Sequence, residues 1–167
     1  MAIVRAKLSQ ILPVIQRRLR TRLDWPAERV LLSLRDDGSH PHEQYLRLWP
    51  RSHVCHQIFR HGAGRIDTRV TRRVAVKLWT RLALDETNDD QQWLTNATLG
   101  HCDLEHTIFD ALENFSPENS DGDWLVYMPL KLYPASEPAK EDEEAEWGCT
   151  VQEYDVCYVL DLDQNIQ

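Results

Sequence analysis

The chain has 167 residues, and its hydrophobic and charged fractions of 42% and 28% are typical of one globular domain rather than a disordered chain. Its net charge is -8, but the two halves of the sequence carry opposite net charges. Residues 1–82 hold 17 Lys/Arg and 6 Asp/Glu (+11), whereas residues 83–167 hold 2 and 21 (-19). The two halves could neutralise each other inside one fold, or basic and acidic surfaces could meet between subunits.

No run of about 18 apolar residues occurs, so we expect no helix that spans a membrane and no membrane partner. The N-terminal sequence MAIVRAKLSQ has no apolar core of a signal peptide, which predicts a cytoplasmic site of synthesis. The four cysteines form no CxxC pair, and we interpret them as small buried hydrophobic residues.

The first predicted element is a helix that begins near Ser9, a candidate N-cap, and ends before Trp25-Pro26. Its apolar residues recur at spacings of three and four and form one stripe: Leu8, Ile11, Leu12, Ile15, Leu19 and Leu23. Two short strands are predicted next, at 29–34 and 44–49, with a turn signal at Asp37-Gly38. Residues 50–65 give no clear pattern.

The strongest signal is a strand over Ile66–Leu82, rich in β-branched residues and free of Gly and Pro. Its even positions are mainly apolar and its odd positions are mainly basic or polar. Seventeen extended residues would span roughly 55 Å, more than the diameter of about 40 Å of a compact domain this size. The strand must therefore bend, break or project beyond its own domain.

The second half is predicted to hold a loop or short helix at 84–96, then a helix with Leu104, Ile108 and Phe115 on its apolar stripe and Asp103 as cap. A strand at 124–133 contains Pro129, which restricts it to an edge or a break. An acidic, proline-containing segment at about 134–146 is predicted to be a flexible loop. The last strand is predicted at 147–162.

We therefore predict a single α+β domain over residues 1–167, with two helices packed on a mainly antiparallel sheet. The expected order is α-β-β-α-β-β, with a long central strand. If the last strand pairs with the long one, directly or from a neighbouring subunit, its acidic face meets Arg69, Arg73 and Lys77.

No pattern in the sequence predicts catalysis or a cofactor. His53, Cys55, His56, His61, His101, Cys102 and His106 match no zinc spacing, and HGAGR lacks the rest of a phosphate-binding loop. Asp161, Asp163 and Asn165 lack the glycine and distal Glu of a calcium loop. Basic residues interleaved with Trp25, Trp49 and Trp79 leave nucleic-acid binding open.

Several strings resemble the tail terminator and tail-completion proteins of tailed phages. They are ILPVIQRRLRTRL, RRVAVKLWTRLALDE, QQWLTNATLG, LEHTIFDALENF and VQEYDVCYVLDL, within residues 9–34 and 66–162. The resemblance implies a structural virion protein that caps the tail tube as a ring, with a hexamer expected, and that ends tube polymerisation. It implies the tail tube protein and head–tail connector or neck proteins as partners, a virion location, and DNA only as passing cargo in the lumen.

In that setting a heterologous ring places two different surfaces of identical subunits in contact. We expect the subunit interface to involve Arg69, Arg73, Lys77, Trp79, Glu153 and Asp155. The acidic residues Glu141, Asp142, Glu143 and Glu144 are expected to face the lumen or a partner. Two alternatives stay open: a neck or head–tail connector component of the same fold, and a cytoplasmic module that binds protein or nucleic acid.

Overall fold

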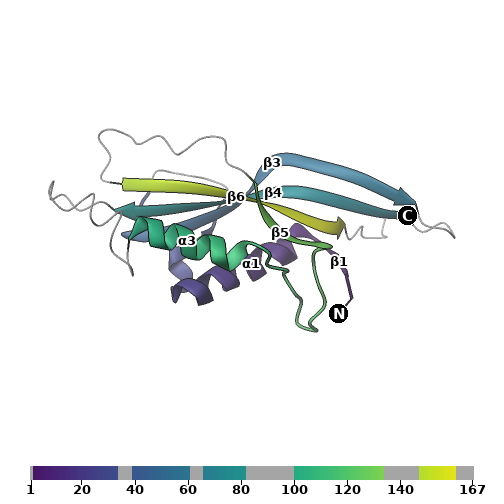
Figure 1. The fold of residues 1–167 in the computed structure, drawn as a ribbon, viewed down its shortest axis with the longest axis horizontal. Helices are drawn as coiled ribbons and strands as arrows, with labels where there is room; N and C mark the ends of the chain where they lie inside the picture. Colours follow the sequence, from purple (N-terminus) through teal and green to yellow (C-terminus); the bar gives the residue numbers. More distant parts are fainter. Residues whose placement is uncertain (1, 34–38, 61–65, 82–99, 134–146, 161–167) are drawn as a thin grey trace.

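The computed structural model describes residues 2–33, 39–60, 66–81, 100–133 and 147–160. These residues form a curled mixed sheet with helices on one face (Figure 1). The elements in chain order are β1 (Arg5–Ala6), α1 (Leu8–Leu23), a 3-10 turn (Ala27–Arg29), β2 (Val30–Leu32), β3 (Gln44–Arg60), β4 (Ile66–Arg81), α3 (His101–Leu112), β5 (Met128–Tyr133) and β6 (Trp147–Leu160). The α+β class is confirmed, but among the described residues β1 precedes the first helix, and three strands, β2, β3 and β4, lie between α1 and α3 in the chain.

The sheet has the strand order β1-β6-β4-β3-β2, and β5 also pairs with β6. The long strand β4 is central, as predicted, and it runs antiparallel to both β3 and β6. Two short pairs are parallel, β1 with β6 and β2 with β3. The sheet is therefore mainly antiparallel, and β4 carries its longest ladders.

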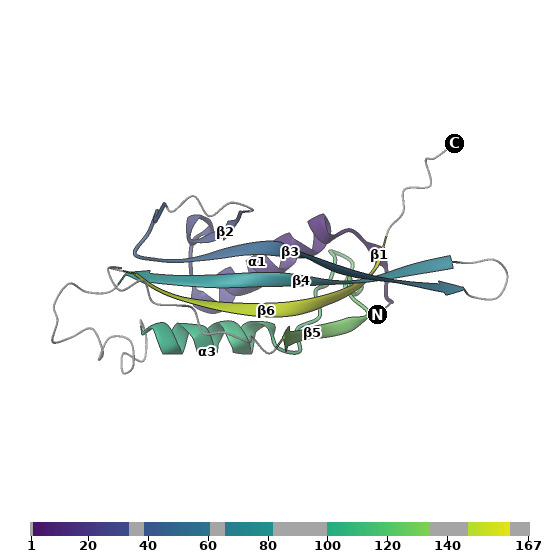
Figure 2. The same cartoon turned by 90° about the horizontal axis from the view of Figure 1, so that it is seen from above.

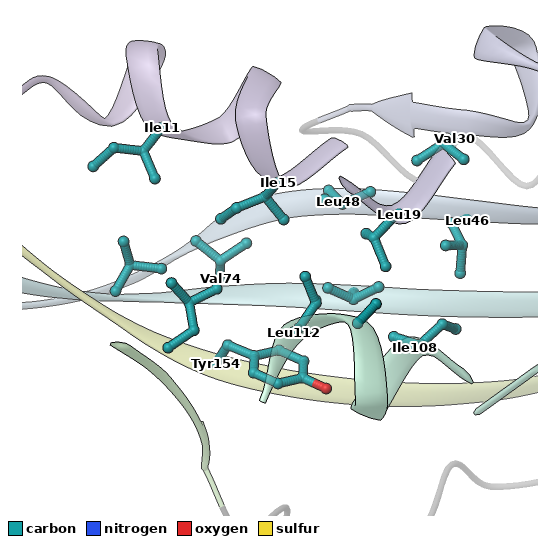
Figure 3. Packing of buried hydrophobic residues seen from close by; sticks show 14 of the residues in the cluster. Ile11, Ile15, Leu19, Val30, Leu46, Leu48, Val74, Ile108, Leu112 and Tyr154 are labelled. Atoms are coloured by element: carbon teal, nitrogen blue, oxygen red, sulfur yellow. The ribbon is translucent and has the colours of Figure 1, made fainter. Parts of the chain in front are cut away.

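The core lies between the sheet and the two helices, which cover the same face (Figures 1 and 2). Even positions of β4 point into it, with Val70, Val74, Val76 and Leu78 each 1% exposed. The helix stripes meet them with Ile11, Ile15, Leu19, Ile108 and Leu112, as Figure 3 shows. The predicted period-two alternation of β4 is thus confirmed, because these even positions are buried, whereas the odd positions other than Ala75 are half-buried or exposed.

The ends of both helices differ from the predicted caps. The N-cap of α1 is Lys7, whose N–H donates to Gln10 Oε1 at 2.7 Å, so Ser9 lies in the first turn. The helix ends at Leu23 because Asp24 adopts the left-handed conformation, with a φ of 53°. The N-cap of α3 is Gly100, and Asp103 is in its first turn, where a carboxylate favours the helix dipole.

Strand β3 is much longer than predicted and continues through Pro50. The β3–β4 register shifts between Pro50 and Val54, and the ladder then resumes to Arg60. Proline has no N–H to give to a ladder, and irregularities of this kind accommodate it. The segment 50–60 gave no clear signal because its side chains alternate poorly, yet β4 supplies a partner along the whole length.

The main-chain groups of β5 form hydrogen bonds with the segment that follows α3, as well as with β6. Leu130 exchanges main-chain hydrogen bonds with residues 114 and 115, and the N–H of Leu132 donates to Glu113 Oε2 at 2.8 Å. The register of β5 with β6 shifts between Met128 and Lys131, around Pro129, as the proline predicted. Within the described residues, this edge therefore offers few main-chain groups with which to pair another strand.

His101 joins α3 to the sheet. Its side chain is 1% exposed, and its Nδ1 and Nε2 lie 3.0 Å and 2.6 Å from the hydroxyls of Thr80 on β4 and Thr150 on β6. Burial lowers the pKa of His101 from 6.5 to about 4. The folded chain therefore holds a neutral imidazole at neutral pH.

We predict that His101 makes the protein less stable on mild acidification. The unfolded chain binds a proton at His101 as the pH falls below about 6.5, whereas the folded chain does not until about pH 4. The free energy of unfolding should fall by about 2 kcal/mol from this group between pH 7 and pH 5. Urea titrations of the native chain and of His101→Gln at both pH values measure this change in the free energy of unfolding. Equal pH dependence of the two chains would contradict the prediction.

Candidate interaction surface on the open face of the sheet

The sheet has one face that no described helix covers. We call it the open face: it consists of the odd positions of β3, β4 and β6, opposite the helix layer (Figure 1). In β4 these positions are Asp67, Arg69, Thr71, Arg73, Ala75, Lys77, Trp79 and Arg81. All six residues that the sequence predicted for a subunit interface lie on this face.

The ladder between β4 and β6 brings basic and acidic side chains together within one chain. Arg73 is directly opposite Asp155, and its Nε lies 3.4 Å from Asp155 Oδ1. Its Nη1 is 3.6 Å from Glu153 Oε2, and Arg51 Nη2 is 2.6 Å from Glu153 Oε1. At these four residues, basic and acidic groups neutralise each other inside one fold, the first of the two interpretations of the charge split. Contacts between subunits through them stay a prediction.

Most cations of the open face lie against aromatic rings. The charged groups lie 3.3 Å to 5.5 Å from the ring centroids in the pairs Arg73–Tyr133, Lys77–Trp79, Arg69–Phe59, Arg69–Tyr127, Arg51–Trp49 and Arg47–Tyr45. Such pairs are worth about 0.5–2 kcal/mol each, more when they are desolvated. The face therefore has a surface of flat rings and held cations rather than freely moving charges.

On this face, Arg69 Nε and Trp79 Nε1 are buried without a hydrogen-bond acceptor among the described residues. Arg69 is covered by the rings of Phe59 and Tyr127. A buried donor without an acceptor costs roughly 1–3 kcal/mol, and native proteins keep few of them. Both residues belong to the predicted interface set.

An aromatic cluster closes one end of the open face. The ring of His40 stacks on Trp147 at 4.0 Å between centroids and 8° between planes, and it meets Trp79 edge-on at 4.8 Å. His40 Nδ1 is 2.8 Å from the hydroxyl of Tyr45, which is fully buried. The cluster joins the ends of β3, β4 and β6.

Sequence reasoning missed Arg51, Phe59, Tyr127, Tyr133 and the His40 cluster. Arg51 and Phe59 fall in the segment that gave no clear pattern, and Tyr127 precedes β5. Arg51 and Phe59 could have been placed beside β4 only by knowing that β3 continues past Pro50. The predicted acidic residues Glu141, Asp142, Glu143 and Glu144, and the histidine and glycines of HGAGR, lie outside the described residues.

A second feature is a groove on the helix side, between α3, β5 and β6. It has a volume of about 380 Å³ and is lined by Cys102, Glu105, His106, Phe109, Leu132, Tyr133, Val151 and Gln152. Burial raises the pKa of Glu105. Leu132 and Tyr133 are 36% and 40% exposed, which leaves apolar surface at its rim.

The cysteines and histidines form no metal centre in the described part of the chain, where no group of three or more possible ligands occurs. Cys157 is buried and Cys149 partly buried, whereas Cys55 and Cys102 are exposed. The prediction of buried cysteines is therefore wrong for those two, because Cys55 lies on the outer part of β3 and Cys102 on the outer side of α3.

Comparison with models of known protein families finds no match, and comparison with curated proteins finds none either. Among the described residues no helix is long and apolar enough to cross a membrane. The role of the chain must therefore be inferred from the resemblance of the sequence strings and from the geometry of this surface.

We predict that Arg73→Glu lowers the free energy of unfolding by about 1–2 kcal/mol, because it places a third carboxylate beside Glu153 and Asp155. Adding Asp155→Arg should recover at least half of the loss. Urea titration at a protein concentration that keeps the chain monomeric measures both effects.

The matched control is Arg60→Glu, since Arg60 is an exposed arginine at the end of β3. Its charge reversal should change stability by no more than about 0.5 kcal/mol. If Arg73→Glu costs no more than Arg60→Glu, or if Asp155→Arg restores nothing, the in-chain cluster does not stabilise the fold.

Proposed function

We propose that this chain is a structural virion protein that caps the tail tube of a tailed phage as a ring. In this role it ends tube polymerisation and presents a surface to the head connector or neck. The role involves no catalysis and no cofactor. The resemblance of the five strings to tail terminator proteins supplies the hypothesis, and the hexamer is the ring size that it implies.

The observation that carries the proposal is the length of the β3–β4 ribbon. Strands of 17 and 16 residues extend past the two helices in both views (Figures 1 and 2). A ribbon that projects from its own core exposes main-chain edges and apolar side chains, which favour pairing with another chain. In an assembly, such a ribbon can pair with a neighbouring subunit, which covers its exposed edges and side chains.

The open face supports the same role. It carries cations already fixed on rings, the buried donors Arg69 Nε and Trp79 Nε1 without acceptors among the described residues, and only partly exposed carboxylates. Surfaces in which Arg and aromatic residues are held in place are typical of the centres of protein interfaces. We therefore keep Arg69, Arg73, Lys77, Trp79, Glu153 and Asp155 as proposed interface residues.

A second candidate is a binding module for nucleic acid, favoured by the same basic and aromatic open face. Against it, the rings already hold cations of the chain itself, and Glu153 and Asp155 share the face. Binding of single-stranded DNA that weakens steeply with salt would support this alternative. A neck or connector component would assemble like a terminator but would bind connectors rather than tubes.

The proposal predicts a discrete oligomer, near six subunits, in multi-angle light scattering of the purified protein at low and high salt. Its physical reason is that a heterologous contact closes into a ring when the rotation between subunits permits it. A monomer that assembles only on isolated tail tubes would also support the proposal. A chain that stays monomeric and binds neither tubes nor connectors would overturn it.

A further inference from the structure

Among the described residues, the outermost part of the β3–β4 ribbon has no third strand beside it. The last register pair of β4 with β6 is Arg69 with Val159, and β3 and β4 continue to the pair Arg60–Ile66. We call residues 58–60 and 66–68, which lie beyond the pair Arg69–Val159, the arm. It lies beyond both helices in Figures 1 and 2. An isolated two-stranded hairpin is marginally stable in water, so the arm gains from any surface that covers it.

One large apolar side chain of the arm is open to solvent. Ile58 is opposite Thr68, an even position of β4, and so points to the same side of the sheet as the core residue Val70. It is 69% exposed, the highest value among the large hydrophobic residues described as exposed. The apolar side of the sheet thus continues past the helices that cover it elsewhere.

The chain cannot cover Ile58 with its own groove beside α3. Gln152 of the groove is opposite Val76 of β4, whereas Ile58 is opposite Thr68 of the same strand. Val76 and Thr68 are eight residues apart along β4. Eight extended residues span roughly 26 Å. The arm and the groove therefore lie at different ends of one subunit, and a contact between them requires two subunits.

The two surfaces are complementary in charge. Helix α3 carries Asp103, Glu105 and Asp110 and has no Lys or Arg, and Glu105 lines the groove. The arm carries Arg60 on the same side as Ile58, and its single carboxylate, on Asp67 of the other side, already pairs with Arg5 at 3.1 Å. Attraction between Arg60 and the acidic helix orients two copies, while burial of apolar area supplies most of the free energy.

We propose that the arm of one copy docks in the groove of a second copy, with Ile58 against the apolar rim formed by Leu132 and Tyr133. The contact joins two different surfaces, so it is head-to-tail and leads to a closed ring or an open filament. This inference rests on the proposed function, because it names the surfaces through which the ring subunits meet.

Site-directed cross-linking tests the contact directly. Cys102 lines the groove and is exposed, so it is a natural attachment point. In a Cys55→Ser background, Ile58→Cys should join to Cys102 of another copy with a short bismaleimide, giving a ladder of dimer and larger bands that Cys102→Ser abolishes. The control is Gln57→Cys, which is exposed one residue away on the opposite side of the ribbon and should give no such product.

Association measured by light scattering provides the second test. Ile58→Glu should weaken self-association about tenfold or more, because it removes an apolar contact and places a carboxylate in a groove that Glu105 already lines. Gln57→Glu adds the same charge on the other side and should assemble like the native chain. Circular dichroism melting confirms that both variants fold.

The outcomes separate this inference from the proposed function. A ring that forms although the Ile58→Cys variant gives no cross-link to Cys102, and that Ile58→Glu leaves intact, overturns the arm-and-groove contact alone. A native chain that is monomeric in solution and on tail tubes overturns both. A cross-linked product that appears only for Ile58→Cys, together with weakened assembly of Ile58→Glu, supports both.

Discussion

The ladder that β4 forms with β3 on one side and β6 on the other is the interaction on which the rest of the structure depends. It fixes the register that puts valines and leucines of β4 beneath the two helices, and it puts arginines on the opposite face. A shift of one residue would exchange the faces, burying the cations and exposing the core. The paired Arg73 and Asp155 help to define that register.

The same ladder shapes the surface that we propose as a subunit interface. Because β3 and β4 are longer than the helices that cover them, their outer parts leave the core and form an arm with an exposed isoleucine. Because β6 carries carboxylates at odd positions, the open face is partly neutralised inside the chain. Fixed cations lose little conformational entropy on binding, which favours an interface over a solvated surface.

The fold class, the presence of both helices, the central strand and its two faces could be predicted from the sequence, because periodicity directly reflects burial. The second helix ends at Leu112, so Phe115 of its predicted stripe lies beyond it. The passage of β3 through Pro50, the parallel pairing of β2 and the two N-caps could not, because tertiary contacts decided them. For the candidate site, the alternation of β4 and β6 placed Arg73, Glu153 and Asp155 on one face. The stacking of Arg69 on Phe59 and Tyr127 joins residues far apart in the chain, and no local pattern signals it.

The central claim is that this chain is a subunit whose long ribbon is completed by an identical neighbour. Electron microscopy of the purified protein, or of tails to which it has been added, tests that claim most directly. The account predicts closed rings of uniform size, with six-fold symmetry if the family resemblance holds, seated at the end of the tail tube. Isolated particles of one subunit that leave tube ends bare would contradict it.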